Sequence, residues 1–246
     1  MRLERCEAGQ AMHLLEQIIS GSLAFPFHGN SSTPPNRGPA VTIAQARPLQ
    51  NPALLSYLQS RCIAPAVASE HCREVHYTVG GRAYFAVGFR NDAGGWELRN
   101  ARFKGCISPK HITTLDNSSD TVLVFEGFMD FLSYLTLKKT PRPAVDSAVL
   151  NSVVNLPEAL AFLQRHRTIH AFLDNDGAGH AATERIVHSC TGSDVVDQSC
   201  FYRQHKDLND FLQEHNRQPG NEHRELVRPQ TVPSGQPDKS SKRMKR

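Results

Sequence analysis

The residues of this 246-residue chain that are best suited to chemistry are acidic side chains placed directly after short apolar segments. Glu126 follows TVLVF, with Asp130 four residues later, and Asp174 and Asp176 follow HAFL in the order Asp-Asn-Asp. Alternation along extended backbone lets Asp174 and Asp176 point to the same side. Carboxylates gathered in one place repel one another and take up protons unless a cation joins them. A divalent cation such as Mg²⁺, which prefers oxygen ligands and phosphates, is the economical explanation, and it indicates phosphoryl chemistry.

The segments that carry these acids alternate between two kinds of sequence. TVLVF, AVDSAVL and TIHAFL are rich in apolar and β-branched residues, and each precedes a stretch typical of a helix. These stretches are 128–138, 157–165 and 178–189. The alternation predicts an α/β domain at 120–216 with a parallel sheet, a fourth strand at 194–196 and a last helix at 208–215. Because ligands bind outside the carboxyl ends of parallel strands, Glu126 and Asp174 should meet at that edge.

Residues 51–115 predict a small α+β subdomain. Asn51 followed by Pro52 is typical of a helix start, and a second helix should begin at Pro65. Alternating apolar and polar residues then predict an antiparallel meander. Its strands are expected at 74–79, 82–89 and 96–99. Residues 82–110 hold six basic and two acidic side chains, which makes this subdomain basic.

The two ends of the chain have a different composition. Residues 1–20 predict one short amphipathic helix, and 21–50, rich in Ser, Pro, Gly and Asn, predict a linker with a short strand at 41–43. Residues 217–246 hold eight Lys or Arg against three Asp or Glu and should form a disordered basic tail. This tail could bind a polyanion or simply keep the chain soluble.

The overall composition excludes several classes of protein. With 39% hydrophobic and 21% charged residues the chain is neither a fibre nor wholly disordered. The six cysteines include no C-x-x-C pair, so neither a disulfide framework nor a zinc ribbon is indicated. No apolar run approaches the ~18 residues of a membrane span, and the first residues lack the apolar core of a signal peptide. We therefore expect a cytoplasmic protein with no membrane partner.

Four motifs resemble the Toprim domain shared by bacterial primases, topoisomerases and some nucleases. They are VFEGFMDFLSYL, LNS, FLDNDGAGHAA and KDLND. The EGFMD and DNDGAGHAA forms are similar to the primase branch, including plasmid and conjugative-element primases. YFAVGFR with LRNARFKG is similar to the basic subdomain that precedes Toprim in primases. The resemblance covers about 52–215 and implies a Toprim-type parallel sheet flanked by helices, preceded by a small basic α+β subdomain.

The resemblance also implies roles for individual acids. Glu126 would position metal and act near the reacting 3′-hydroxyl, Asp174 and Asp176 would be metal ligands, and Asp207 in KDLND would assist a further metal. Further candidates are Asp130 and Asp210. The metal would be Mg²⁺ or Mn²⁺. A two-metal arrangement would activate the attacking oxygen and stabilise the leaving pyrophosphate.

By the same resemblance, Arg90, Arg99 and Lys104 would form the basic surface that holds template or nucleotide phosphates. The expected activity is metal-dependent synthesis of RNA primers on single-stranded DNA, in replication of a chromosome or a mobile element. Single-stranded DNA and nucleotides would be the partners, with a replicative helicase or mobilisation proteins as further ones. Primases usually begin with a zinc ribbon, which is not seen here, and residues 1–20 are similar to what would remain downstream of one.

Several alternatives remain open at the level of sequence. The same acids could serve a Toprim nuclease, or the chain could be a non-catalytic DNA-binding remnant. Asp130 could merely lie in the first turn of its helix, where the helix dipole favours an acid. Asp174 and Asp176 could merely cap the helix at 178–189. GAGHAA at 177–182 also fits a dinucleotide-binding fingerprint, although it does not open its domain.

Overall fold

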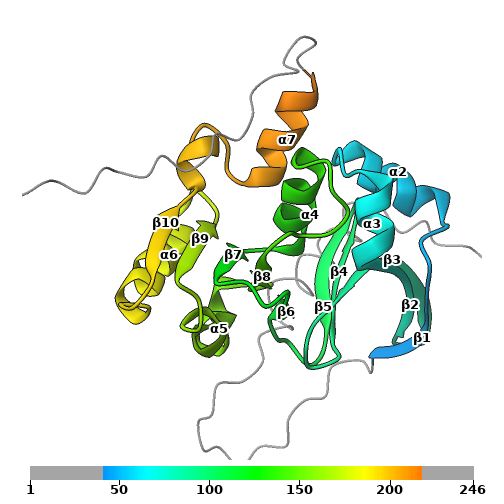
Figure 1. Cartoon of the computed structure of the whole chain (residues 1–246). Helices are drawn as coiled ribbons and strands as arrows, with labels where there is room; N and C mark the ends of the chain where they lie inside the picture. Colours follow the sequence, from blue (N-terminus) through cyan, green and yellow to red (C-terminus); the bar gives the residue numbers. More distant parts are fainter. Residues whose placement is uncertain (1–40, 218–246) are drawn as a thin grey trace, which may run out of the picture.

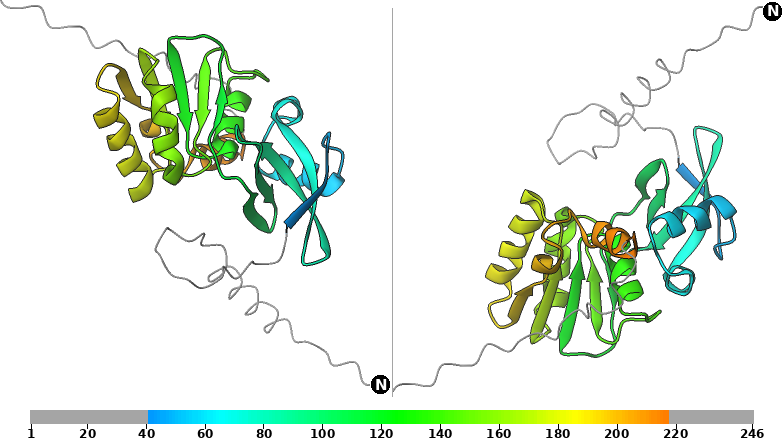
Figure 2. Two further views of the ribbon diagram at one scale, coloured as in Figure 1. Left: turned by 90° about the horizontal axis from the view of Figure 1, so that it is seen from below. Right: turned by 90° about the horizontal axis from the view of Figure 1, so that it is seen from above.

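The computed structural model describes residues 41–217, which form two five-stranded sheets and the helices around them (Figure 1). The two sheets lie side by side, with strands from residues 41–107 in one and strands from residues 113–197 in the other (Figure 2). The expected helix at 1–20, the first part of the linker and the tail from 218 lie outside the described residues. No helix of 41–217 is both long and apolar enough to cross a bilayer.

The smaller sheet is an antiparallel meander in the order β1-β2-β3-β4-β5. Its strands are β1 (Val41–Arg47), β2 (Cys72–Val79), β3 (Arg82–Arg90), β4 (Trp96–Asn100) and β5 (Phe103–Ile107). The helices α2 (Pro52–Ser60) and α3 (Pro65–His71) connect β1 to β2. The predicted meander and both helices are therefore present, whereas β5 was not predicted because FKGCI alternates poorly and contains a glycine.

Strand β1 corrects the expected linker, which was to contain only a short strand at 41–43. The strand runs to Arg47 because buried Glu74 on β2 holds that part of the chain. Glu74 accepts from Arg47 at 2.7 Å and from the Asn51 N–H at 2.7 Å. Burial alone would raise the pKa of Glu74, but the hydrogen bonds from His76, Arg47 and the backbone lower it to about 2. The carboxylate thus stays charged and fixes the entry to α2.

The larger sheet has the order β10-β9-β7-β8-β6, with β10, β9, β7 and β8 parallel and β6 antiparallel at the edge. Its strands are β6 (Thr113–Leu115), β7 (Thr121–Phe125), β8 (Asp146–Val149), β9 (Thr168–Phe172) and β10 (Asp194–Asp197). Its helices are α4 (Phe128–Leu137), α5 (Leu156–Leu163), α6 (Gly177–Ser189) and α7 (Leu208–Arg217). The predicted α/β fold with a parallel sheet is confirmed; only the three-residue edge strand β6 was not foreseen.

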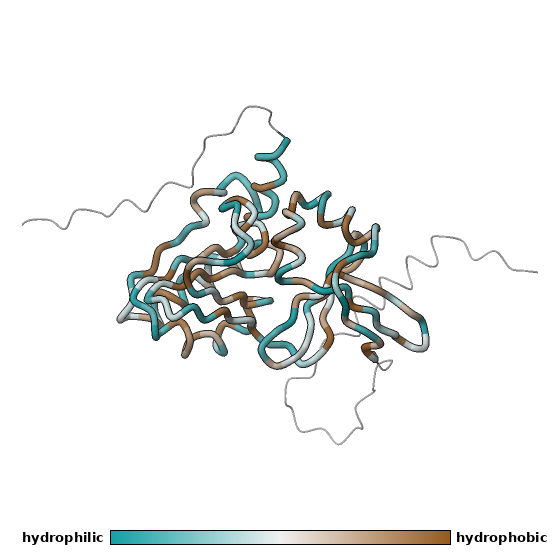
Figure 3. The backbone as a smooth tube through the Cα atoms, turned by 45° about the vertical axis from the view of Figure 1, so that its right-hand side comes forward, coloured by the Kyte–Doolittle hydropathy of each residue, from teal (hydrophilic) through white to brown (hydrophobic). Residues whose placement is uncertain are grey.

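Alternation along β7 assigns the helices to the two faces of this sheet. Val122 and Val124 belong to the core under α5 and α6, whereas Leu123 and Phe125 belong to the core under α4 and α7. The core under α4 and α7 continues into the smaller sheet, where the ring of Phe89 stacks on that of Phe128 at 5.2 Å. Helix α4 therefore lies between the sheets (Figure 1), and hydrophobic stretches run through the strands on both sides of it (Figure 3). This shared core holds the smaller sheet in place beside the parallel one.

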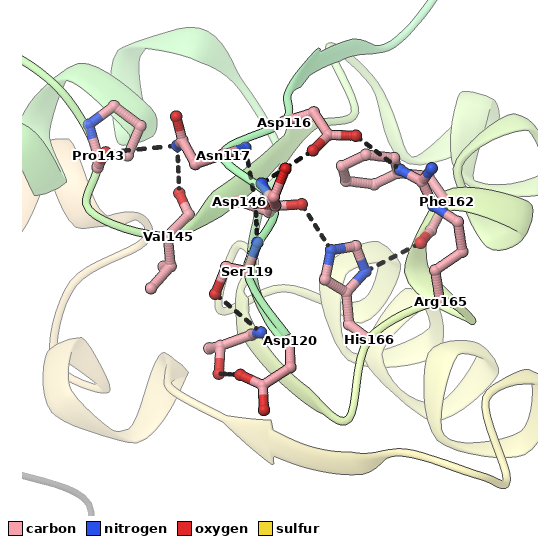
Figure 4. Close-up of polar contacts among 12 residues, drawn as sticks. Asp116, Asn117, Ser119, Asp120, Pro143, Val145, Asp146, Phe162, Arg165 and His166 are labelled. Atoms are coloured by element: carbon pink, nitrogen blue, oxygen red, sulfur yellow. Dashed lines mark hydrogen bonds and ion pairs between the residues drawn. The ribbon is translucent and has the colours of Figure 1, made fainter.

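A buried polar network closes the amino end of the larger sheet, opposite the carboxylate edge (Figure 4). Asp146, at the start of β8, accepts from the N–H groups of Asn117 and Ser119 and lies 2.9 Å from Nε2 of His166. Nδ1 of His166 faces the carbonyl of Phe162 at 2.9 Å. Burial would raise the pKa of Asp146, but the hydrogen bonds from His166 and the backbone hold it below its ordinary value. This pair joins the loops that lead into β7 and β9.

Removal of this carboxylate should destabilise the fold without touching the opposite edge. Asp146→Ala leaves two backbone donors and His166 without their acceptor, and we expect it to lower the free energy of unfolding by about 2 kcal/mol. Asp146→Asn keeps the acceptor for the two backbone N–H groups and should cost less than half as much. Urea denaturation of the full chain measures both values. Equal losses in the two variants would show that the backbone contacts contribute little.

Candidate metal and phosphate site

Glu126 and Asp174 come together because β7 and β9 are neighbours in the parallel sheet. Phe125 and Phe172, near the ends of those strands, are paired in register. The chain continues into Glu126 on one strand and into Asp174 on the other, and the N–H of Asp174 donates to Oε2 of Glu126 at 3.3 Å. The structure therefore places two of the expected acids side by side at the carboxyl edge.

Asp176 has a different local task. Its Oδ1 accepts from the N–H groups of Ala178 and Gly179, each at 3.0 Å, so Asp176 is the N-cap of α6. These hydrogen bonds lower the pKa of Asp176, and the bond from Gly179 has the largest effect. A Cβ on Gly179 would overlap the carbonyl of Asp174, so glycine allows α6 to begin close to the strand end. Because Asp176 occupies the N–H groups a dinucleotide pyrophosphate would need, the fingerprint at 177–182 serves helix packing.

The two adjacent acids are electrostatically strained. Burial raises the pKa of Glu126. Burial and then the charge of Glu126 raise the pKa of Asp174 to about 7. Nζ of Lys206 lies 3.6 Å from Oδ2 of Asp174, and the charge of Asp174 raises the pKa of Lys206 in turn. One lysine thus only partly compensates the negative charge of this edge.

Asp130 and Asp207 are two further acids close to Glu126 and Asp174. Asp130 on α4 is buried, and its Oδ1 accepts from the N–H of Asn209 at 3.2 Å. Burial, and after it the charge of Asp207, raise the pKa of Asp130 well above its ordinary value. Asp130 is therefore a buried acid and not an exposed one at a helix start. Asp207 precedes α7, and its Oδ1 accepts from the N–H of Asp210 at 2.7 Å. Asp210 itself turns away and pairs with Arg61 at 3.8 Å.

The smaller sheet contributes cations from the opposite side. Lys104 on β5 and Arg99 on β4 are paired in register, and the charge of Arg99, then burial, lower the pKa of Lys104. Lys104 is close enough to Asp174 and Glu126 for their charges to counter that shift. Burial lowers the pKa of Arg99, while Tyr57 and Asp130 counter the shift.

Arg90 is not brought into this group. It lies three residues beyond the point where β3 pairs with Arg99, and its guanidinium stacks over Trp96 at 5.9 Å from the ring centre.

Two site residues were missed by the sequence reasoning. Lys206 stands directly before Asp207 in KDLND, a signal that could have found it. Asn209, three residues after Lys206, bridges Asp130, Ser133 and the carbonyl of Arg61, and no sequence signal marks that role.

The donors at this edge suit a divalent cation. Carboxylate oxygens are the ligands that Mg²⁺ and Mn²⁺ prefer, and the pKa values of Glu126 and Asp174 are raised first by burial and further by the charge of neighbouring acids. Within 41–217, no three Asp, Glu, His or Cys side chains are arranged closely enough to hold one ion. Asp174 faces Lys206, and Asp176 caps α6. Metal binding here stays a prediction, and it requires Asp174 to exchange its lysine partner for the ion.

The raised pKa of Asp174 leads to a pH-dependent prediction without metal. In the folded state Asp174 binds its proton up to about pH 7, whereas in the unfolded chain it loses the proton near its ordinary value of 3.8. The folded state therefore binds more protons between these limits, and the contribution of Asp174 to stability falls as the pH rises through them. Asp174→Asn removes this penalty. In chelator, the variant should exceed wild type by about 1–3 kcal/mol at pH 8 and match it at pH 3.5; a difference independent of pH would contradict the assignment.

The sequence and the fold are similar to known families and structures. Residues 123–212 match the family described as Toprim-like, and 43–108 match a domain of unknown function, DUF8464. No curated protein matches the chain. The crystal structure of the primase fragment of the bacteriophage T7 primase-helicase protein is 20% identical over 74% of this chain and 80% of that chain, with a TM-score of 0.48.

A second solved structure is the Aquifex aeolicus primase, represented by its zinc-binding and RNA polymerase domains. It is 14% identical over 68% of this chain, with a TM-score of 0.50. The chain covers 55% of that structure. At such identities the likeness concerns the fold alone. The parallel sheet described above agrees with the match of residues 123–212 to the Toprim-like family, and the fold of the chain is similar to that of a bacterial primase.

Proposed function

We propose that the chain is a primase-like nucleotidyltransferase that joins ribonucleotides on single-stranded DNA, with Mg²⁺ or Mn²⁺ at the carboxylate edge. The observation that carries this proposal is the apposition of Glu126 and Asp174, on neighbouring parallel strands, with Lys104 and Lys206. Acids alone would suit a metal, and cations alone would suit phosphate. Both together, facing one another, suit the transfer of a nucleotidyl group.

Each side chain would have a distinct task in this reaction. Glu126 keeps one carboxylate oxygen without a hydrogen bond in the described residues, so this oxygen can receive a proton from an attacking 3′-hydroxyl. Lys104 and Lys206 would hold the transferred phosphate and the departing pyrophosphate through their charge. Asp174 would hold the ion, with Asp176 and Asp207 near it. The ion itself would supply positive charge to activate the attacking oxygen and stabilise the leaving group.

Asp130 and Asn209 would position these groups without touching substrate. The hydrogen bond between them joins α4, which follows Glu126, to α7, which follows Lys206 and Asp207. Asn209 also binds Ser133 on α4 through its side chain at 2.8 Å. The two loops that carry the acids and the lysine are thereby held at a fixed separation.

A product assay on the full chain tests the proposal. The protein is incubated with single-stranded DNA, labelled ribonucleotides and Mg²⁺ or Mn²⁺, and the products are separated by length. Short labelled RNA that disappears with chelator is the expected result. Shortened DNA without new RNA would instead show a nuclease. DNA binding without either product would show a non-catalytic protein.

A further inference from the structure

Four side chains of the smaller sheet, three of them exposed and one buried, lie together on the face away from α2. We call Ile43, Tyr77, Tyr84 and Phe103 the aromatic cluster. Ile43, Tyr77 and Tyr84 are paired in register across β1, β2 and β3, so they share one face. The rings of Tyr77 and Tyr84 stack at 5.7 Å, and that of Phe103 lies 6.4 Å from Tyr77. Tyr84 is 43% exposed and Phe103 is 38% exposed.

The two exposed rings are held in place by their surroundings. Tyr84 rests on Tyr77, which is buried. The ring of Phe103 lies over Gly105, where a Cβ would overlap it, so glycine leaves room for the ring against the backbone of β5. A ring held in this way loses little conformational freedom when a ligand stacks on it. The cluster is therefore a preformed platform.

The charge around the platform is positive. Residues 75–91 and 98–115, which form β3, β5 and most of β2 and β4, contain no Asp or Glu. Arg82 and Arg102 are exposed close to Tyr84 and Phe103 in the sequence, and neither forms an ion pair with a residue of 41–217. Exposed aromatic rings flanked by arginines are the features with which proteins bind single-stranded nucleic acid, through base stacking and phosphate contacts. An acid-free surface favours a polyanion over an ordinary protein partner.

The platform is connected to the carboxylate edge through β5. Successive side chains of a strand point to opposite faces, so Phe103 joins the aromatic cluster while Lys104 points to the side of Asp174 and Glu126. Arg102, in the turn between β4 and β5, directly precedes Phe103. A strand of DNA whose phosphates meet Lys104 would need only to pass this turn to bring its next bases to the two rings.

We propose that the aromatic cluster is a second contact for single-stranded DNA, where bases stack on Tyr84 and Phe103 while Arg82 and Arg102 meet the phosphates. The proposal rests on the proposed function only in taking single-stranded DNA as the partner.

The test uses the full chain and a fluorescently labelled single-stranded oligodeoxynucleotide. In the double variant Tyr84→Leu and Phe103→Leu, leucine keeps apolar packing but cannot stack. The expected result is binding about 10- to 100-fold weaker with an unchanged slope of log affinity against log salt. Arg102→Ala should instead lower that slope by about 0.7. Phe201→Leu, which changes an equally exposed phenylalanine on the larger domain, is the matched control and should bind as wild type does.

Crosslinking gives an independent readout that does not depend on affinity. An oligonucleotide containing 5-iodouracil, irradiated with the wild-type chain, should crosslink to peptides that contain Tyr84 or Phe103. Unchanged affinity of the double variant, with crosslinks elsewhere, would overturn the proposal. A change in sedimentation without a change in DNA affinity would also overturn it, and would assign the platform to contact between copies of the chain. If the double variant binds DNA more weakly but the wild-type chain makes no primers, this inference stands and the proposed function alone is refuted.

Discussion

Glu126→Gln is expected to lower the rate of primer synthesis by about 10³-fold while leaving affinity for single-stranded DNA within about twofold of wild type. The substitution is nearly isosteric and keeps an oxygen that can accept from the N–H of Asp174. It removes the negative charge and the proton acceptor that we assign to the reacting hydroxyl. Because burial already raises the pKa of Glu126, the neutral side chain should fit the folded protein well.

This outcome is measured by single-turnover synthesis at saturating DNA and nucleotide, with affinity measured separately. Thermal unfolding in chelator is the control, since Glu126→Gln should be at least as stable as wild type without metal. Wild-type activity in the variant would show that Glu126 acts only as a structural acceptor. A parallel loss of DNA affinity would place Glu126 in substrate binding.

Lys104→Ala is expected to reduce turnover by about 10²-fold with a much smaller change in DNA affinity. Lys104 is the cation of the smaller sheet on which the charges of Asp174 and Glu126 act. A positioned charge next to the transferred phosphate stabilises the transition state more than the bound substrate.

Arg90→Ala is the matched control for this prediction. Arg90 also belongs to the smaller sheet and was grouped with Lys104 by sequence resemblance, yet it stacks on Trp96 instead of facing the acids. Its removal should leave turnover within about twofold of wild type. If Arg90→Ala reduces turnover and Lys104→Ala does not, the basic surface lies elsewhere on the sheet and our assignment of Lys104 is wrong.

The alternation of apolar segments and helical stretches was sufficient to predict the larger domain. Strand β7 (TVLVF) is continuously apolar after its first residue because it is buried on both faces, and this burial makes it visible in the sequence. The edge strand β6 was missed because its three residues are too few to show a pattern. Strand β1 was taken for linker because its stability comes from contacts with Glu74, 27 residues away from Arg47, which no local pattern records.

The candidate site was predictable in part for a similar reason. Acids that end neighbouring strands meet because of the topology of parallel sheets, so Glu126 and Asp174 could be placed from sequence. The capping role of Asp176 was weighed as an alternative, and the structure assigns it. The burial of Asp130 depends on α7 packing on α4, and the proximity of Lys104 depends on how two separate sheets share one core. Such contacts between distant elements are set by tertiary packing and leave no periodic signal.

The central claim is that the carboxylates following β7 and β9 hold a divalent ion, and Mn²⁺ titration of the full chain followed by electron paramagnetic resonance tests it most directly. Free Mn²⁺ gives the signal, so bound ion is measured as its loss. Asp174→Asn combined with Asp176→Asn is the variant of choice, because asparagine at 176 still caps α6 and the fold is preserved. We predict that wild type binds Mn²⁺ at pH 8 and that the double variant binds it at least about tenfold more weakly. Equal binding by the two proteins would contradict the account.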